Sequence, residues 1–427
     1  MRPRGFTLLE LIIAMTISLL TVAAGVSLLI ASQRWFQTGS ADRSMQETAR
    51  VALDEITNNL RSVGYGMEPT FAFDLGILSN TVQDRIPPGT TARFGGYNCP
   101  SGNCPSLRDR IDGPDELVFY SRDPLFERDV VSVGANSLVL AGKSTDSTLL
   151  NNGQVLQVMC YGSNNQWLWA YVSIATVNSS NPAAVAVTLI PTPGQPADFP
   201  YQNGLLGQPC FAAGAASVKA FKIDRYRYYV AAVDTGGNIQ PWETPNTHPF
   251  LMLDQGLSSG GNPIVTAIAP DVEDLQVAYV YPLAGGEQVL GADLGTPVQA
   301  NTIGDDTGFN LTPTFPPYAI PSFSINPNDA ALALTTHHPA NIRAVNVAIV
   351  VRTPVLDPNV PDATVPGVLN RPDLAGEAGY RRQVFQSAAY TRNLETALPV
   401  FPTYDPNYAG ANCCPTAGTC AGNCGGG

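Results

Sequence analysis

The hydrophobic pattern of this chain is most pronounced near its beginning. From Phe6 to Ile30 nearly every residue is apolar, and Glu10 is the one ionisable side chain. A helix over this stretch would be about 37 Å long, enough to cross the roughly 30 Å hydrocarbon core of a bilayer. The pattern predicts a membrane-spanning helix whose carboxylate needs a partner, because an unpaired charge is costly there. Gly25 and Ser27 are weak helix formers, so local unwinding is an open alternative.

The chain then becomes polar, but a helical period continues. No proline occurs between Arg4 and Pro69, and Gly64-Tyr65-Gly66 supplies a stop signal. We therefore expect one helix from Phe6 to about Val63, roughly 85 Å long. Its second half should bury an apolar stripe with spacings of three and four. The stripe consists of Met45, Ala49, Ala52, Ile56, Leu60 and Val63.

From Met67 onward the pattern indicates β-structure. Short runs of β-branched and aromatic residues alternate with proline, glycine and asparagine. The fold class that we expect is α+β, a long N-terminal helix packed on a large antiparallel β-rich domain, in one lobe or two. Tyr226–Val230 alternates less cleanly, which suggests a sheet edge. The expected strands are 116–120, 137–140, 155–159, 167–174, 184–190, 218–231, 273–281, 344–352 and 382–390.

The residues around the start of the apolar stretch form a recognisable motif. Arg2 and Arg4 precede Gly5, and Phe6-Thr-Leu-Leu-Glu10 follows. This arrangement resembles a type IV prepilin leader. The resemblance implies cleavage by a prepilin peptidase between Gly5 and Phe6, methylation of the new amino terminus, and an assembly role for Glu10. In that role its carboxylate pairs with the terminal ammonium of a neighbouring subunit, and such a pair is strong when both charges leave water.

Two plainer interpretations explain less of this segment. A secretory signal peptide has a shorter uncharged apolar region of about 7–15 residues, although Val22-Ala23-Ala24 offers a small-residue cleavage site. A simple membrane anchor accounts for the length but not for Gly5 through Glu10.

Four later stretches extend the resemblance to minor pilins of the PilW type. The resemblance as a whole covers the first ~65 residues well and the last core strands fairly. No counterpart is found for 282–339, which we interpret as an insertion, or for the tail. The stretches are Gln46–Tyr65, with its Ala-Arg-x-Ala-Leu and Leu-Arg-x-x-Gly-Tyr patterns, then Asp271–Tyr279, Asn341–Arg352 and Tyr380–Leu394, which ends in an Arg-Asn pair.

Charge and composition narrow the class of protein. The formal net charge is -12, or -14 once Arg2 and Arg4 are removed with the leader, and Lys143, Lys219 and Lys222 are the only lysines. An acidic surface repels nucleic-acid phosphates, so we expect no nucleic-acid partner. With 39 Gly, 36 Pro and 14% charged residues, the body is typical of a loop-rich extracytoplasmic protein.

Eight cysteines favour an oxidising compartment. Cys99 and Cys104 close a short loop and are expected to pair, and Cys160 and Cys210 could form the next disulfide. In the glycine-rich tail, neighbouring cysteines bond each other only with strain, so we expect them to pair with the two that follow, with the connectivity open. A zinc knot is the alternative. The tail cysteines are Cys413, Cys414, Cys420 and Cys424.

We find no constellation that points to catalysis, a cofactor or a metal. His337-His338 suggests a surface loop rather than a metal site, because no third ligand accompanies it. Gly142-Lys143-Ser144 lacks the first glycine of a P-loop. Asp305-Asp306 and Asn326–Asp329 lack the spacing of a calcium loop and are better interpreted as turns.

The resemblance implies the organisation and the role. The expected parts are a leader (1–5), a membrane and filament-core helix (6–30), its amphipathic half (31–65), a β-rich domain (66–399) with an insertion at about 282–339, and a Cys/Gly-rich tail (400–427). Such a subunit waits in the bacterial inner membrane with its body in the periplasm. It then joins a priming complex at the pilus tip that initiates assembly and presents an adhesin.

The implied partners are the major pilin, other minor pilins, the prepilin peptidase and the pilus assembly platform. Two alternatives stay open. One is a tip-complex pseudopilin of type II secretion. The other is a membrane-anchored periplasmic binding protein that never polymerises.

Overall fold

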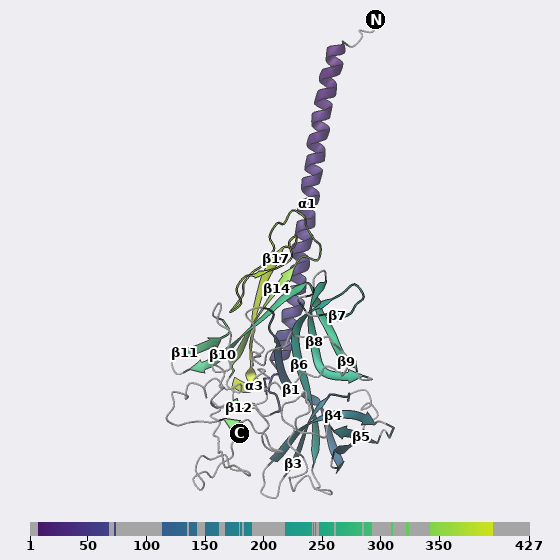
Figure 1. Ribbon diagram of the computed structural model, residues 1–427, viewed down its shortest axis with the longest axis vertical. Helices are drawn as coiled ribbons and strands as arrows, with labels where there is room; N and C mark the ends of the chain where they lie inside the picture. The colour runs from purple at the N-terminus through teal and green to yellow at the C-terminus, as the bar shows by residue number, and fades with distance from the viewer. Residues whose placement is uncertain are drawn as a thin grey trace.

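The protein is α+β, with a long N-terminal helix and a large antiparallel β-rich body, as the computed structural model in Figure 1 shows. This agrees with the fold class expected from the sequence. The structure describes residues 7–67, 72–73, 113–134, 136–142, 150–161, 167–178, 180–181, 183–189, 218–240, 242, 244, 247–259, 262–283, 286–292, 309–310, 322–323 and 342–395.

Helix α1 runs from Leu8 to Leu60 without a break, so it shows no unwinding at Gly25 or Ser27. Its first half projects away from the body, and its second half lies against the sheets (Figure 1). The expected stripe from Met45 to Val63 is buried throughout. The helix therefore divides as its hydrophobic pattern predicts, into an exposed apolar half and a docked amphipathic half.

The β-strands and the short closing helix follow α1. Their bounds are β1 Leu117–Val133, β2 Ser137–Ala141, β3 Val155–Tyr161, β4 Trp167–Asn178, β5 Ala184–Leu189, β6 Lys219–Val233, β7 Ile239–Gln240, β8 His248–Ser259, β9 Asn262–Pro270, β10 Val272–Leu283, β11 Gly286–Leu290, β12 Phe309–Asn310, β13 Ser322–Phe323, β14 Ala344–Arg352, β15 Thr364–Val365, β16 Leu374–Ala375, β17 Arg382–Tyr390 and α3 Arg392–Glu395.

The larger sheet closes on itself at the end of the body away from the projecting helix (Figure 1). Its strand order is β1-β2-β5-β4-β3-β6-β8-β9, with β7 beside β6, and β1 also pairs with β6. Strands β1, β2, β5, β4, β3 and β6 thus form a closed ring of antiparallel pairs. Closure removes exposed strand edges, and the ring encloses its own apolar cluster, which includes Leu140, Leu156, Val172 and Val187.

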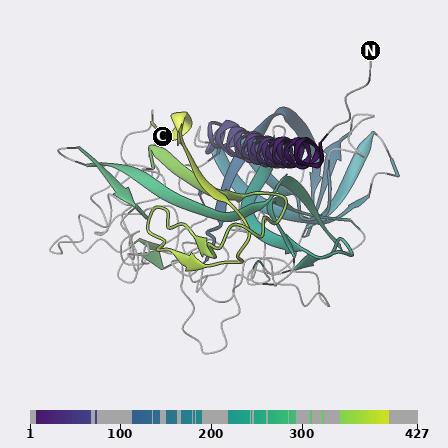
Figure 2. The same cartoon turned by 90° about the horizontal axis from the view of Figure 1, so that it is seen from above.

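A second sheet has the order β11-β10-β14-β17. This sheet and part of the larger sheet pack together against α1. The stripe of α1 packs with apolar side chains of β6, β8, β10 and β14 in one core. Figure 2, seen from above, shows α1 nearly end-on and lying against one side of the sheets. Before β1, the Asp115 carboxylate accepts a hydrogen bond from Val277 N at 2.8 Å and so links the two sheets.

Several expectations need correction. All nine expected strands exist, but several of them, above all β1, are longer than expected. The long strands β8 and β9 and the short strands β7, β11, β12, β13, β15 and β16 were missed. Strand β6 is not a sheet edge, because Tyr228 pairs with Leu117 of β1 on one side and with Leu253 of β8 on the other. The uneven alternation of this stretch reflects burial on both faces. Part of the expected insertion belongs to the β10–β11 hairpin, and the tail lies outside the described residues.

Candidate functional site

The exposed half of α1 begins with a capping box. The Thr7 side chain accepts a hydrogen bond from Glu10 N at 3.3 Å. The Glu10 Oε2 atom accepts from Thr7 N at 3.0 Å and from Thr7 Oγ1 at 2.9 Å. Threonine at the N-cap and glutamate three residues later satisfy each other's backbone N–H groups, which explains why the helix begins here.

This geometry leaves one carboxylate oxygen of Glu10 without a donor. Glu10 is the only carboxylate in the exposed apolar part of α1, Leu8–Ile30, which we call the stem. Both bonds from Thr7 end on Oε2, and no donor among the described residues reaches Oε1. The side chains from Leu8 to Ile30 are exposed, so Glu10 sits on an apolar rod without a cover. By length and composition, α1 is the one helix in the described part of the chain that could cross a membrane.

The docked half of α1 is attached by polar contacts as well as by its stripe. Asn59 donates through Nδ2 to the hydroxyl oxygen of Tyr228 at 2.7 Å and to Glu55 Oε1 at 2.8 Å. Burial raises the pKa of Tyr228 well above its ordinary value, so its hydroxyl stays neutral. After α1 the chain turns at Gly64, whose backbone has φ +71°. Glycine suits this position, because a side chain disfavours this φ and its Cβ would lie 2.8 Å from Leu394 Cδ2.

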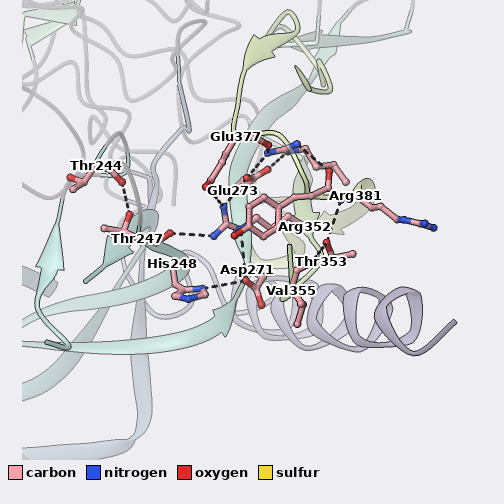
Figure 3. Close-up of polar contacts among 12 residues, drawn as sticks. Thr244, Thr247, His248, Asp271, Glu273, Arg352, Thr353, Val355, Glu377 and Arg381 are labelled. Atoms are coloured by element: carbon pink, nitrogen blue, oxygen red, sulfur yellow. Dashed lines mark hydrogen bonds and ion pairs between the residues drawn. The ribbon is translucent and has the colours of Figure 1, made fainter. Parts of the chain in front are cut away.

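A cluster of charges lies beside α1 at the stem end of the body (Figures 1 and 3). We call it the arginine cluster, and it consists of Asp271, Glu273, Arg352, Glu377 and Arg382. The Arg352 guanidinium lies 3.3 Å from Glu273 Oε1, 3.5 Å from Glu377 Oε2 and 3.8 Å from Asp271 Oδ1. Arg382 binds both oxygens of Glu273, at 2.5 and 3.0 Å.

Local backbone features place these side chains. Asp271 forms the one-residue corner between β9 and β10 at φ +59°, a region that aspartate tolerates better than most residues. The register of β10 against β14 shifts between Val272 and Asp274, and such a bulge redirects the intervening Glu273. Arg352 ends β14 and Arg382 begins β17, directly opposite each other in the antiparallel pair.

A second ion pair is buried beside β10, at the residue that follows Glu273. Arg371, fully buried, donates through Nε to Asp274 Oδ2 at 2.5 Å, and through Nη2 to Pro366 O at 2.6 Å. Gln276 donates to Asp274 Oδ1 at 3.0 Å. Asp274 and Arg371 therefore fasten the segment between β14 and β17 onto the sheet.

The arrangement of these groups is that of a structural clamp. Each charge meets an opposite charge or a carbonyl, and the Arg352 guanidinium stacks 4.1 Å from the centre of the Tyr380 ring. His248 Nδ1 lies 3.8 Å from Asp271 Oδ1 and adds a further contact to the same carboxylate. No group of three or more metal-ligating side chains is found within the described ranges.

Several sequence-predicted residues cannot be placed. Gly5 and Phe6 lie outside the described residues, as do His337-His338, Lys143-Ser144, Asp305-Asp306 and the Asn326–Asp329 stretch. Cys160 is described, is buried in β3 and belongs to a disulfide whose other half is not described. Its pairing with Cys210 stays a prediction, as do the pairings of Cys99, Cys104, Cys413, Cys414, Cys420 and Cys424, all of which are outside the described residues.

Sequence reasoning found part of the arginine cluster and missed the rest. Asp271, Glu273, Arg352 and Arg382 belong to stretches that the sequence had singled out, but nothing in their spacing showed that they meet. Glu377 and Arg371 were not singled out. The one available signal was the presence of charged residues inside otherwise apolar strands, since such charges need partners.

Comparison with known proteins adds one finding. Residues 1–26 match the family model described as the prokaryotic N-terminal methylation motif. No curated protein and no solved structure matches the chain significantly.

The matched motif supports a type IV pilin-like or pseudopilin-like protein. It implies processing by prepilin peptidase and involvement with pilus machinery. Together with the exposed apolar half of α1, it fits anchoring in the inner membrane and a place in a pilus. It suggests a structural, non-enzymatic protein.

Proposed function

We propose that this protein is a minor pilin of a type IV pilus, of the PilW type, that works by assembly rather than catalysis. The observation that carries the proposal is a methylation-type leader joined to a 53-residue helix whose first half is bare and carries a single carboxylate, that of Glu10. A bare apolar rod on a folded body is stable only in lipid or among similar rods.

Cleavage between Gly5 and Phe6 would place a new ammonium on Phe6, one residue before Thr7 and four residues before Glu10. The open Oε1 atom of Glu10 can then accept a hydrogen bond from the ammonium of a neighbouring subunit, while Oε2 keeps its bonds to Thr7. Charge-assisted bonds of this kind are short and strong away from water. The pair therefore favours one axial stagger between adjacent stems.

The processing step has a direct test. Mass spectrometry of the protein isolated from its membrane should find N-methylated phenylalanine at position 6. A mature start near Val26 would instead indicate ordinary secretion and would contradict the proposal.

The role of Glu10 is tested by Glu10→Gln, which keeps the size and hydrogen-bonding ability of the side chain but removes its charge. We expect normal amounts in the membrane and loss of incorporation into sheared filaments. Thr16→Ala is the matched control, because Thr16 bonds only within its own turn, to Ile12 O and Ile13 O. Equal incorporation of both variants would refute the assembly role.

We place the subunit at or near the pilus tip, in a priming complex with other minor pilins that presents an adhesin. The size of the body supports this placement, because two sheets and a closed strand ring would crowd a dense shaft. Immunogold labelling of sheared pili should mark filament ends. Even labelling along the shaft would oppose the tip position.

A pseudopilin of type II secretion is the second candidate, because the same motif and stem would serve it. Deletion of the gene separates the two roles: loss of twitching motility indicates a pilus, and loss of enzyme export indicates secretion. A membrane-anchored binding protein would keep its function in Glu10→Ala, whereas a filament subunit would not.

The disulfide framework belongs to the same proposal, since it requires an oxidising compartment such as the periplasm. Peptide mapping without reduction should find Cys99 joined to Cys104 and Cys160 joined to Cys210. It should also find the four tail cysteines joined to one another. Free tail thiols that bind zinc would support the zinc knot instead.

A further inference from the structure

An apolar tip lies on the segment that connects β14 with β17. Val355 and Leu356 stand between Pro354 and Pro358, with exposed fractions of 72% and 47%. The segment lies at the end of the body from which α1 projects (Figure 1). Flanking prolines restrict the backbone, so the tip holds its shape without being buried. An exposed apolar surface of fixed shape at this end of the body is expected to contact an apolar partner.

The stem itself shows where a membrane would lie. Trp35 and Phe36 are exposed and follow Ile30, the end of the apolar stretch, by about 7.5 Å of helix. That distance matches a headgroup layer of roughly 5–8 Å, where tryptophan is enriched. Thr38, two residues later, is already half-buried, and Figure 1 shows the segment between β14 and β17 reaching alongside the middle of α1. This end of the body therefore lies close to the level of the headgroups.

The charges of the segment indicate which lipid surface it suits. Asp357 is paired with Arg381 at 3.6 Å, and Glu377 is paired with Arg352 at 3.5 Å. Asp362 accepts a hydrogen bond from Thr364 N at 2.8 Å. With acids paired or capped and no basic patch, the segment has no electrostatic preference for anionic lipid. A zwitterionic headgroup region fits it better.

We propose that Val355 and Leu356 rest in the headgroup layer of the bilayer that holds the protein's own stem. The tip and the Trp35–Phe36 pair then form two contacts with one membrane, and the body is held at a fixed tilt before assembly. This inference rests on the membrane-anchoring part of the proposed function. It adds a lipid-binding surface on the body that α1 alone would not supply.

The test uses the full chain with the photocrosslinking residue p-benzoylphenylalanine at one position at a time, in vesicles of phosphatidylethanolamine. Position 355 probes the tip. Position 28 is the positive control, because Leu28 lies in the apolar half of α1. Position 125 is the matched negative control, since Leu125 of β1 is 90% exposed but lies on the ring of strands away from the stem.

We expect lipid adducts at position 28 and at position 355, with a yield at 355 several-fold above that at 125 and little change when phosphatidylglycerol or salt is added. Adducts at 28 with only background at 355 would overturn this inference and leave membrane anchoring intact. Absence of adducts at both positions would refute anchoring itself. A protein adduct in place of lipid at 355, or dependence on phosphatidylglycerol, would also overturn it.

Discussion

Asn393 closes the end of α1: its Nδ2 atom lies 3.0 Å from the carbonyl oxygen of Val63 and 3.4 Å from that of Arg61. The last carbonyl groups of a helix lack partners within the helix, and this side chain from the far end of the chain supplies one. The Gly-Tyr stop after α1 and the Arg-Asn pair after β17 are therefore two parts of one joint.

Replacing Asn393 should loosen this joint. We expect Asn393→Ala to lower the free energy of unfolding by about 0.5–1.5 kcal/mol, because one hydrogen bond is lost. Asn393→Asp should cost more, since a carboxylate would face two carbonyl oxygens at the negative end of the helix. Denaturant unfolding of the full chain in detergent measures both. The exposed Asn58→Ala should stay within about 0.5 kcal/mol, and an equal loss there would contradict the assignment.

The buried ion pair between Arg371 and Asp274 should show strong coupling. Arg371→Met leaves Asp274 buried without its cation, so we expect a loss of about 3–5 kcal/mol. The double variant Asp274→Asn/Arg371→Met removes both charges and should be more stable than Arg371→Met alone. A double-mutant cycle on unfolding free energies checks this. Simple additivity of the two single variants would show that the pair does not act as a unit.

The docked half of α1 should depend on its stripe and tolerate changes elsewhere. Ile56 is fully buried, so Ile56→Ala should cost about 2–5 kcal/mol through lost transfer energy and a residual cavity. Val51, on the same helix but half exposed, gives the control Val51→Ala with an effect within about 0.5 kcal/mol. Thermal unfolding followed by near-ultraviolet circular dichroism compares them, and similar losses would mean that the stripe does not carry the docking.

Stability should depend on pH through Asp271. Burial raises the pKa of Asp271, against the opposing effect of Arg352 and His248. From about pH 4, the ordinary carboxyl range, up to this raised pKa the folded state binds more protons than the unfolded state, so the free energy of unfolding falls as pH rises. Asp271→Asn cannot titrate and should flatten this part of the curve.

Because the His248 ring lies 3.8 Å from the Asp271 carboxylate, the Asp271 comparison belongs in a His248→Gln background. Denaturant unfolding at a series of pH values from 4 to 7 measures the slopes. If the chain that retains Asp271 gains stability with rising pH relative to Asp271→Asn, the direction of the pKa shift is wrong.

Local pattern was sufficient for several features. The periodic stripe from Met45 to Val63 required a helix with one buried face, and the apolar stretch before it required an exposed rod. The strands β14 and β17 were expected with the bounds that they have, because each contains β-branched residues and is flanked at both ends by residues that favour turns. The capping of α1 by Thr7 and Glu10 follows from residue spacing alone.

The two longest strands that were not expected, β8 and β9, have an ambiguous pattern. In β8 the run Phe250–Leu253 is apolar without alternation, and β9 begins and ends near proline. Such an apolar run does not by itself distinguish a strand from a buried helix segment, and here the pairing of β8 with β6 and with β9 decides it. Strand β6 was expected at an edge because one of its partners, β1, lies far away in the sequence.

The sequence by itself determined what depends on neighbours a few residues away: the stem, its lone carboxylate at Glu10, the apolar stripe and most strand positions. Only the tertiary structure decided which strands close into a ring, that Glu273 joins Arg352 and Arg382, and that Asn393 reaches the end of α1. The physical reason is that periodicity and capping are local, whereas strand pairing and charge pairing also join residues far apart in the sequence and are selected by the packing of the whole chain.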